Sequence, residues 1–359
     1  MEEEYQAKKG NDVFKCPQCG ANLKYEIETK SLFCEFCDYH LKLSEEKSDV
    51  EHSFSEIDDA AKTRWDHSVK KANCKNCGAE VIIDSNLLTV ECPFCNTSMV
   101  VSDEEIQGIK PDRVIPFVVS SQVCIGNYQK WIKRKVFAPT RLKKELPNPS
   151  LFSTYIPTWT YDTDVFASYN GRLGKKYQVR VGSGKDAHYE TRIRYFRVSG
   201  VYQLKEDDVL VNSGNSINQK EIQSIEPFNT NESIVYDNRY LAGHSCEHYK
   251  MDVKDGWKVA QSIIMQDLKN GILSQYDYDV IDYLNIYPTY SNITYKYVII
   301  PIWLCHFLYN KKKYRFIANG ENGKISGKYP KSPVKISILV LVILAIIIAL
   351  IIIYIKKYY

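Results

Sequence analysis

The stretch FKCPQCGANLKYEIETKSLFCEFCD, residues 14–38, returns in a second form as ANCKNCGAEVIIDSNLLTVECPFCN, residues 72–96. An offset of 58 residues superposes the four cysteines of one copy on those of the other. Such self-similarity indicates a duplicated structural unit rather than a chance grouping of cysteines. Each copy contains two Cys-x-x-Cys pairs with fourteen residues between them, and the eight residues are Cys16, Cys19, Cys34, Cys37, Cys74, Cys77, Cys92 and Cys95.

Each copy predicts a closed zinc site. A Cys-x-x-Cys turn lets two thiolates reach one ion, and two such turns complete the tetrahedral shell that Zn²⁺ accepts. The residues between the pairs predict two short strands around a turn, the pattern of a zinc ribbon. Disulfides and redox or iron sites are the alternatives, and a cytoplasmic location disfavours disulfides. We therefore expect two structural Zn²⁺ ions, because four thiolates leave no position open for water or substrate.

The end of the chain predicts a membrane-spanning helix. Residues 336–355 contain no charged side chain, and twenty helical residues at about 1.5 Å each cover the roughly 30 Å hydrocarbon core of a bilayer. A buried core helix is the alternative, but a helix without a polar face would need protein on every side. More lysines precede this segment than follow it, and the first twenty residues contain no apolar run. We expect a single-pass, C-terminally anchored protein of the cell membrane with its N-terminal bulk in the cytoplasm.

Charge is divided unevenly along the chain. Residues 1–110 hold thirteen Lys and Arg against twenty-two Asp and Glu, a net charge of −9, and the remaining residues carry +13. Each zinc with four thiolates would add −2 to the acidic part. Such a module repels phosphate backbones, so the cysteine units favour protein over nucleic acid as a partner.

Two basic clusters lie in the second half, at residues 129–146 and 311–315. Beside a cytoplasmic leaflet they could bind anionic lipid headgroups at about 1 kcal/mol per well-placed cation. Solvated helix and turn faces are one alternative, and nucleic-acid binding by the same cations is another.

Residues 111–330 predict an α+β domain with an antiparallel sheet. The motifs IPTW, residues 156–159, and IPIW, residues 300–303, suggest related halves of one sheet, each followed by a Tyr-Asn turn. Hydrophobic spacing and alternation supply the remaining elements. These are a strand at 114–119, helices at 120–137 and 255–273, sheet over 155–211, and strands over 295–327 with a hairpin across 309–314.

No catalytic motif emerges from the sequence. The segment GSGKDA, residues 182–187, superficially fits a dinucleotide loop, but an alternating strand pattern follows it where a helix is required. It also fails as a phosphate loop, because Val179 occupies the first glycine position and Asp186 the Ser/Thr position. His244 and His248 are spaced to share one face of a helix, so a metal or acid–base site is conceivable there, and packed histidines are the commoner outcome. Cys124, Cys246 and Cys305 fit packing positions. We therefore expect that this chain is not an enzyme, that it has no catalytic residues and that zinc is its only cofactor.

In combination these motifs resemble a bacterial family of double zinc-ribbon proteins that often carry the labels transcription-factor-IIB-type zinc-ribbon protein or primosomal replication-restart helicase. The resemblance rests on the two cysteine units and on RVIPFVV, W-x5-FAP, YIPTWTYD, EPFN, YLAG and ANGENGKISGKYP. It implies tail-anchored adaptors of phage-shock-type envelope-stress systems, which hold cytosolic proteins, including an SPFH/virion-core-like protein, at the membrane. Relatives usually have an apolar residue after YLAG, where this chain has His244.

The sequence therefore predicts two small β zinc ribbons followed by an α+β domain and a single C-terminal transmembrane helix. The expected function is a non-enzymatic membrane adaptor that recruits a cytosolic protein partner. A membrane-tethered nucleic-acid-binding factor is the alternative, and a metal enzyme around the two histidines is a weaker third. The expected divisions are ribbon 1 over 1–45, a linker over 46–72, ribbon 2 over 73–102, the α+β domain over 111–330 and the membrane helix over 336–355.

Overall fold

The computed structural model describes residues 14–43, 45–47, 51–57, 69–84, 89–95, 97–100, 108–184 and 187–358 of the 359-residue chain. Most of the predicted linker, including Trp65, lies outside these residues. The α-helices are α2 (Ser121–Arg134), α3 (Thr140–Lys144), α4 (Gln219–Ile225), α5 (Val253–Leu273) and α6 (Pro333–Tyr358), and the 3-10 turns are η1 (Phe54–Glu56), η3 (Thr230–Glu232) and η4 (Asn238–Leu241).

The strands fall into two groups. Those of the N-terminal part are β1 (Lys24–Glu26), β2 (Ser31–Phe33), β3 (His40–Lys42), β4 (His52–Ser53), β5 (Val69–Asn73), β6 (Glu80–Asp84), β7 (Thr89–Glu91) and β8 (Ser98–Val100). Those of the body are β9 (Arg113–Val114), β10 (Ser150–Val181), β11 (His188–Asn212), β12 (Ile234–Val235), β13 (Ser245–Glu247), β14 (Val280–Tyr309), β15 (Lys312–Asn319) and β16 (Ile325–Gly327).

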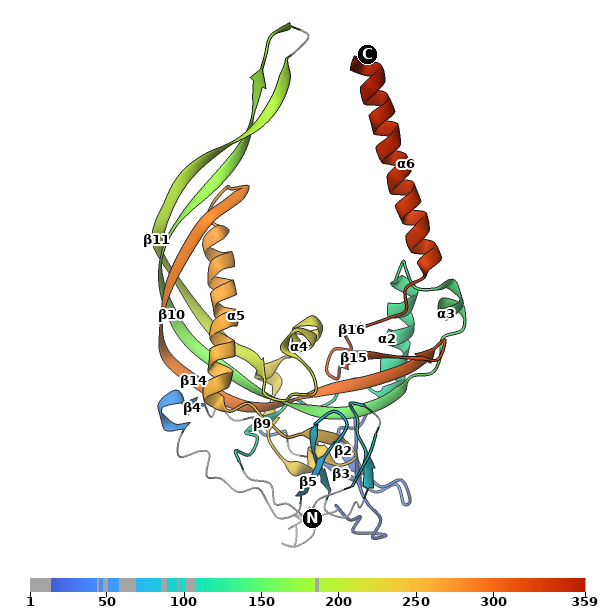
Figure 1. Cartoon of the computed structure of the whole chain (residues 1–359). Helices are drawn as coiled ribbons and strands as arrows, with labels where there is room; N and C mark the ends of the chain where they lie inside the picture. Colours follow the sequence, from blue (N-terminus) through green and yellow to red (C-terminus); the bar gives the residue numbers. More distant parts are fainter. Residues whose placement is uncertain are drawn as a thin grey trace.

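Three very long antiparallel strands, β11, β10 and β14, form the curved body of an 11-stranded sheet (Figure 1). The IPTW and IPIW motifs lie on neighbouring strands, with Ile156 opposite Ile300. The predicted turn after IPTW is wrong, because Tyr169 and Asn170 lie inside β10. A Cβ at the following Gly171 would lie only 2.7 Å from the carbonyl oxygen of Tyr283. This glycine therefore allows a close cross-strand approach rather than a turn.

Helix α5 covers the inner face of the sheet (Figure 1). Its buried side chains, Trp257, Ala260, Ile264 and Leu268, recur every three or four residues and form one apolar stripe. Asp252 caps the first turn by accepting a hydrogen bond from the backbone N–H of Asp255. The predicted helix over 255–273 is thus confirmed, as is the helix predicted over 120–137, which appears as α2.

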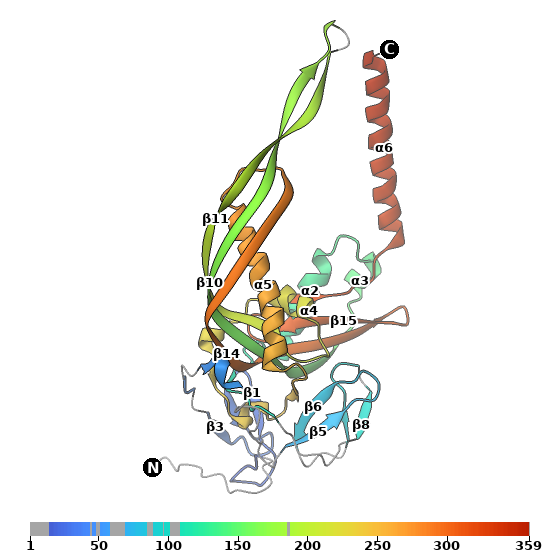
Figure 2. The ribbon, with the colours of Figure 1, turned by 60° about the vertical axis from the view of Figure 1, so that its left-hand side comes forward.

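The two four-cysteine units, here called the first and second cysteine modules, lie on the opposite side of the sheet from α6 (Figures 1 and 2). The first module contains β1–β3 and contacts the body where the N–H of Tyr25 donates to the carbonyl of Ala242. The second module joins the large sheet directly, because β6 pairs with β13. Its strand β5 begins at Val69, within the segment predicted as linker, and β4 of that segment pairs with β14.

Helix α6 is long and apolar enough to cross a membrane, and its apolar stretch is not buried against the rest of the described chain. Its first turn is tied to the segment between α2 and α3. The N–H of Ser332 donates to the carbonyl of Phe137 at 2.8 Å, and Lys335 Nζ donates to the carbonyl of Ala138 at 2.7 Å. The basic stretch predicted at 129–146 therefore lies at the foot of α6.

Candidate metal centres and the surfaces around them

The first cluster brings Cys16, Cys19, Cys34 and Cys37 together from two tight turns. The N–H of Gly20 donates to the carbonyl of Cys16 at 2.8 Å, and Gly20 has a φ of 76°, which a residue with a side chain rarely adopts. The Sγ atoms of Cys16 and Cys37 are 3.4 Å apart, as are those of Cys19 and Cys34.

The second cluster repeats this geometry with Cys74, Cys77, Cys92 and Cys95. The N–H of Gly78 again donates to Cys74 at 2.8 Å, with a φ of 75°. The Sγ atoms of Cys74 and Cys95 are 3.5 Å apart, and those of Cys77 and Cys92 are 3.6 Å apart.

These clusters fit the metal that the sequence predicts. Within each cluster all four sulfur atoms lie within 4.8 Å of one another. A tetrahedral ion with Zn–S bonds of about 2.3 Å requires sulfur–sulfur separations of about 3.8 Å. Eight cysteines thus form two sets that are compatible with two Zn²⁺ ions, and each set would hold its ion with thiolates alone.

The two modules differ at equivalent positions of their second turns. Phe36 of the first module is 79% exposed, whereas Phe94, which corresponds to it under the 58-residue offset, is 5% exposed. Phe94 belongs to a core cluster that includes Ile302 and Leu304 of β14. The second module therefore packs this turn against the body, and the first module leaves the same turn in solvent.

Cations of the body donate to backbone carbonyls in the turns of the second module. Lys313 Nζ donates to the carbonyl of Cys95 at 3.2 Å, and Lys250 Nζ donates to the carbonyl of Gly78 at 3.1 Å. Lys250 also lies 3.3 Å from the carboxylate of Glu80. One residue of the basic cluster at 311–315, Lys313, therefore contacts the second module.

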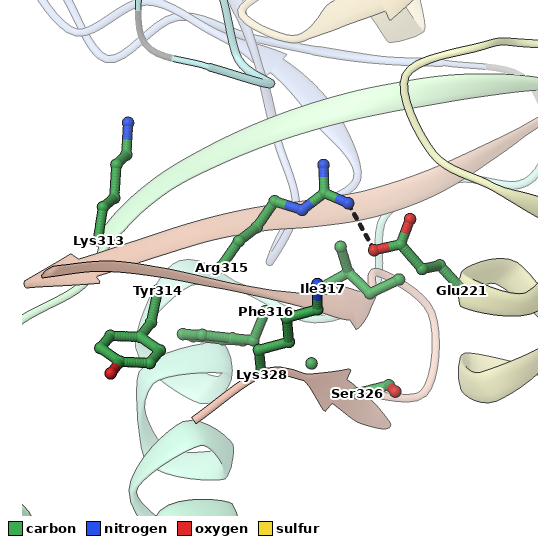
Figure 3. A pocket seen from close by; sticks show the side chains of 9 residues that line it. Glu221, Lys313, Tyr314, Arg315, Phe316, Ile317, Ser326 and Lys328 are labelled. Carbon is green, nitrogen blue, oxygen red and sulfur yellow. Dashed lines mark hydrogen bonds and ion pairs between the residues drawn. The ribbon is translucent and has the colours of Figure 1, made fainter. Parts of the chain in front are cut away.

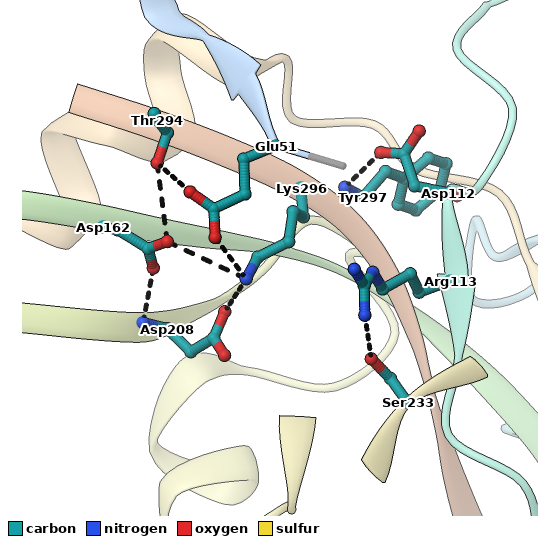
Figure 4. Close-up of polar contacts among 9 residues, drawn as sticks. All are labelled: Glu51, Asp112, Arg113, Asp162, Asp208, Ser233, Thr294, Lys296 and Tyr297. Atoms are coloured by element: carbon teal, nitrogen blue, oxygen red, sulfur yellow. Dashed lines mark hydrogen bonds and ion pairs between the residues drawn. The ribbon is translucent and has the colours of Figure 1, made fainter. Parts of the chain in front are cut away.

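A cluster of three carboxylates surrounds the ammonium group of Lys296 on β14 (Figure 4). Its Nζ lies 2.8 Å from Asp208 Oδ1, 3.2 Å from Glu51 Oε1 and 3.8 Å from Asp162 Oδ2. Burial raises the pKa of Asp162 to about 6, because desolvation of its carboxylate outweighs the nearby ammonium group. The cluster ties the segment before the second module to β10, β11 and β14.

His244 and His248 do not share the face of a helix, although their spacing would allow it. These residues flank the short strand β13, which pairs with β6 of the second module. Neither belongs to a metal-ligating group among the described residues. His244 instead stacks on Phe117 with ring centroids 4.8 Å apart, and Tyr25 of the first module approaches its edge.

Both ring nitrogens of His244 are buried and have no hydrogen-bond partner among the described residues, although the residue as a whole is partly exposed. Desolvation lowers the pKa of this imidazole to about 4. The sequence pointed to His244 as unusual but gave no sign of this contact with the first module.

A pocket of about 380 Å³ lies along β15 and β16 (Figure 3). Arg315 crosses it and pairs with Glu221 of α4 at 2.5 Å. The other lining residues are Lys313, Tyr314, Phe316, Ile317, Ser326, Gly327 and Lys328.

No family model and no solved structure matches this chain. The chain is 26% identical over 332 residues to the uncharacterized protein YdjG of Bacillus subtilis (strain 168). The alignment covers 90% of this chain and 92% of that protein. The similarity therefore extends well beyond the two cysteine modules, over nearly the full length of both proteins.

Proposed function

We propose that this chain is a tail-anchored, non-enzymatic membrane adaptor. Two structural zinc ribbons are displayed on the cytoplasmic side and bind a cytosolic protein, which is thereby held at the cell membrane. A role in envelope stress follows from the family resemblance and belongs to the same proposal. The eight cysteines hold the two ions, and α6 is the anchor.

The observation that carries this proposal is the placement of the two ends. The cysteine modules and α6 lie on opposite sides of the sheet (Figures 1 and 2). Insertion of α6 into a bilayer would leave the modules at the side that faces away from it. Such an arrangement suits a protein that displays a binding module to the cytosol.

The comparison of Phe36 with Phe94 indicates the chemistry of the partner. Phe94 is buried in a core cluster that also contains aliphatic side chains of β14, and Lys313 of the body donates a hydrogen bond to the neighbouring carbonyl of Cys95. The first module presents the same turn with Phe36 exposed and with Glu35 beside it. We expect its partner to supply an equivalent surface, an apolar patch flanked by a cation.

The test is copurification of proteins with the full-length chain extracted from membranes. The Phe36→Ser variant removes the exposed ring, and Tyr287→Ser, an exposed aromatic residue of the sheet, is the matched control. We expect a protein that copurifies with the unmodified chain and the control to be lost from Phe36→Ser. Replacing the four cysteines of the first module should have the same effect.

Two outcomes would contradict the adaptor function. One is the absence of any protein whose recovery depends on the first module. The other is salt-sensitive retention of DNA or RNA by the chain, which would favour the nucleic-acid alternative. Recovery of the chain in the soluble fraction after cell lysis would remove the anchor.

A further inference from the structure

The three long strands leave one face of the sheet uncovered. Along β10 the side chains alternate strictly between buried and exposed from Val165 to Arg172. The buried set includes Ala167, which belongs to the same core cluster as Ile264 and Leu268 of α5. The exposed set lies on the opposite face, which no element of the described chain covers (Figure 1).

We call this surface the outer face of the sheet. It consists of every second residue, starting with the first, of the segments 166–172 of β10, 197–203 of β11 and 283–289 of β14, and all twelve are exposed. The strand register arranges them in four rows of three, with the residue of β10 in the middle of each row. At about 4.8 Å between strands and about 6.8 Å between rows, the outer face measures roughly 14 by 27 Å.

The outer face has the composition of a protein interface. Phe166, Val201 and Tyr287 form a contiguous apolar group around Ser168, and each of the three has about half of its surface exposed. None of the twelve residues is Asp, Glu or Lys. Aromatic residues and arginine are enriched in protein interfaces, whereas Lys, Glu and Asp are depleted there. The outer face is therefore suited to contact with protein.

We propose that the outer face binds the outer face of a second copy of this chain, across a two-fold axis that runs parallel to the strands. In such a symmetric contact the same surface serves both copies. The axis passes over β10, so β10 meets β10 of the second copy, and β11 of each copy meets β14 of the other. Sheets packed face to face in this way lie about 10 Å apart, with their strands aligned to within about 30°.

The strand register makes this arrangement self-complementary. Each row faces the same row of the second copy in reverse order. Val201 therefore faces Tyr287 of the second copy, and the same contact recurs on the other side of the axis, so the apolar groups bury one another. Phe166 meets its own counterpart at the axis. In the last row Arg197 faces Tyr283 of the second copy, where a cation–π contact can form.

Arg172 is the charged residue that meets its own counterpart at the axis. Within its own chain its Nε lies 2.5 Å from Asp282 Oδ2, and its guanidinium lies over the ring of Tyr195 at 4.9 Å from the centroid. The paired carboxylate offsets the positive charge in each copy. The two arginines therefore approach as paired groups rather than as isolated cations.

The direction of α6 also favours this axis. Helix α6 and the upper part of β10 extend to the same side of the body (Figures 1 and 2). An axis parallel to the strands therefore leaves the α6 helices of both copies on the same side, as two tail-anchored chains in one membrane require. Antiparallel edge-to-edge pairing of two β11 strands would instead point the two helices in opposite directions.

The size of the contact indicates its strength. A standard stable interface has about 20–30 residues on each side, and the outer face supplies roughly half of that number. We therefore expect a reversible dimer with a dissociation constant on the order of 10 μM.

The first test is sedimentation velocity of the full-length chain in detergent over a concentration series. Val201→Glu places a carboxylate against Tyr287 of the second copy, and Tyr287→Lys places an ammonium group against its Val201. Each variant alone should raise the dissociation constant about tenfold or more, because the symmetry disrupts two contacts at once. Val123→Glu on α2 and Tyr177→Lys on the opposite face of β10 make the same changes at exposed residues and should leave the constant unaltered.

An equal mixture of the two outer-face variants tests the register. In the mixed dimer the introduced glutamate of one chain faces the introduced lysine of the other, and the second contact keeps the native valine and tyrosine. This mixture should therefore dimerise with a constant within about threefold of that of the unmodified chain.

Photocrosslinking identifies the contact directly. The photoreactive residue p-benzoylphenylalanine replaces Tyr287 in a chain of normal isotope content, which is mixed with unmodified chain labelled with ¹⁵N. We expect adducts between position 287 and ¹⁵N-labelled peptides that contain residues 197–203 of β11. The same photoreactive residue in place of Phe36, in the first module, should give no adduct with these peptides.

Each contrary outcome would overturn the proposal. One is a chain that stays monomeric up to about 100 μM. Another is a dimer that is equally stable in the variants and the controls, which would place the contact elsewhere, for example along α6. Failure of the two variants to form mixed dimers would refute the proposed register. Adducts of position 287 in cells with a different protein, in place of a second copy, would assign the outer face to that protein.

Discussion

His244 offers a quantitative test of how the first cysteine module is held to the body. Its ring lies between Phe117 and Tyr25, and both ring nitrogens are buried without hydrogen-bond partners among the described residues. Desolvation lowers the pKa of this imidazole in the folded state to about 4, against 6.5 in water. Release of the module exposes the ring and restores its ordinary pKa, so this release should become easier in acid.

The magnitude follows from linkage. A group whose folded pKa is depressed from 6.5 to about 4 contributes almost nothing at pH 7.5. At pH 5.5 it weakens the attachment by roughly 1.4 kcal/mol, about tenfold in the equilibrium constant for opening. His244→Phe keeps the stack on Phe117 and cannot titrate, so the variant should lack this acid sensitivity. A packing cost of the larger ring would shift its stability equally at both pH values.

Native-state hydrogen exchange at Tyr25 is the suitable assay, because its N–H donates to Ala242 at 2.9 Å across this contact. At each pH the intrinsic exchange rate of this N–H is the same in the unmodified chain and in His244→Phe. The ratio of the observed exchange rates of these two proteins therefore gives the difference between their free energies of opening. That ratio should change about tenfold between pH 7.5 and 5.5. His188→Phe, at an exposed ring at the start of β11, should leave this ratio unchanged. A ratio for His244→Phe that does not vary with pH would refute the buried, unpartnered state of this imidazole.

Three further predictions concern stability. Phe94→Ser should weaken the attachment of the second module by about 3–5 kcal/mol, because it removes a buried ring, whereas Phe36→Ser should change the free energy of unfolding by under about 0.5 kcal/mol. Thermal denaturation compares the two variants, and equal shifts in midpoint would contradict the different burial of the two rings. Metal analysis should find two zinc equivalents, and chelation should accelerate exchange in both modules while the β10–β14 pairing stays protected; a single equivalent would contradict two independent centres. The pKa of Asp162 is raised from 3.8 to about 6 in the folded state, so its contribution to stability is present below pH 3.8 and is lost as pH rises through 6. Asp162→Asn should therefore gain stability relative to the unmodified chain as pH rises from 4 to 6, and a constant difference in denaturation midpoint would refute this.

The features that could be predicted from sequence are those with a local cause. The cysteine spacing determines which thiols share a turn, and the structure brings the eight cysteines together in the two predicted sets. The uncharged residues 336–355 fall within α6, and apolar spacing identified α2 and α5. Each of these signals depends on residues that are close together along the chain.

The features that escaped prediction depend on distant partners. Tyr169 and Asn170 resemble a turn locally, but β11 and β14 pair with both edges of β10 at that point and keep it extended. The spacing of His244 and His248 fits a helix, yet Cys246 between them pairs with Ile82 of the second module. Tertiary pairing overrides local propensity at both places. No local pattern indicates that one cysteine module would bury its second turn and the other expose it.

The division of charge along the chain acquires a more specific meaning from these contacts. Treated as a whole, an acidic N-terminal part and a basic body suggest an electrostatic preference for protein and for anionic lipid. Lys250 and Lys313 contribute to the basic surplus, but they are engaged at the turns of the second module. Four thiolates around Zn²⁺ carry a net −2, so cations beside these turns offset that charge and favour docking of the module. Part of the basic surplus therefore serves the docking of the second module, and reversal of the charge of Lys313 should loosen that module.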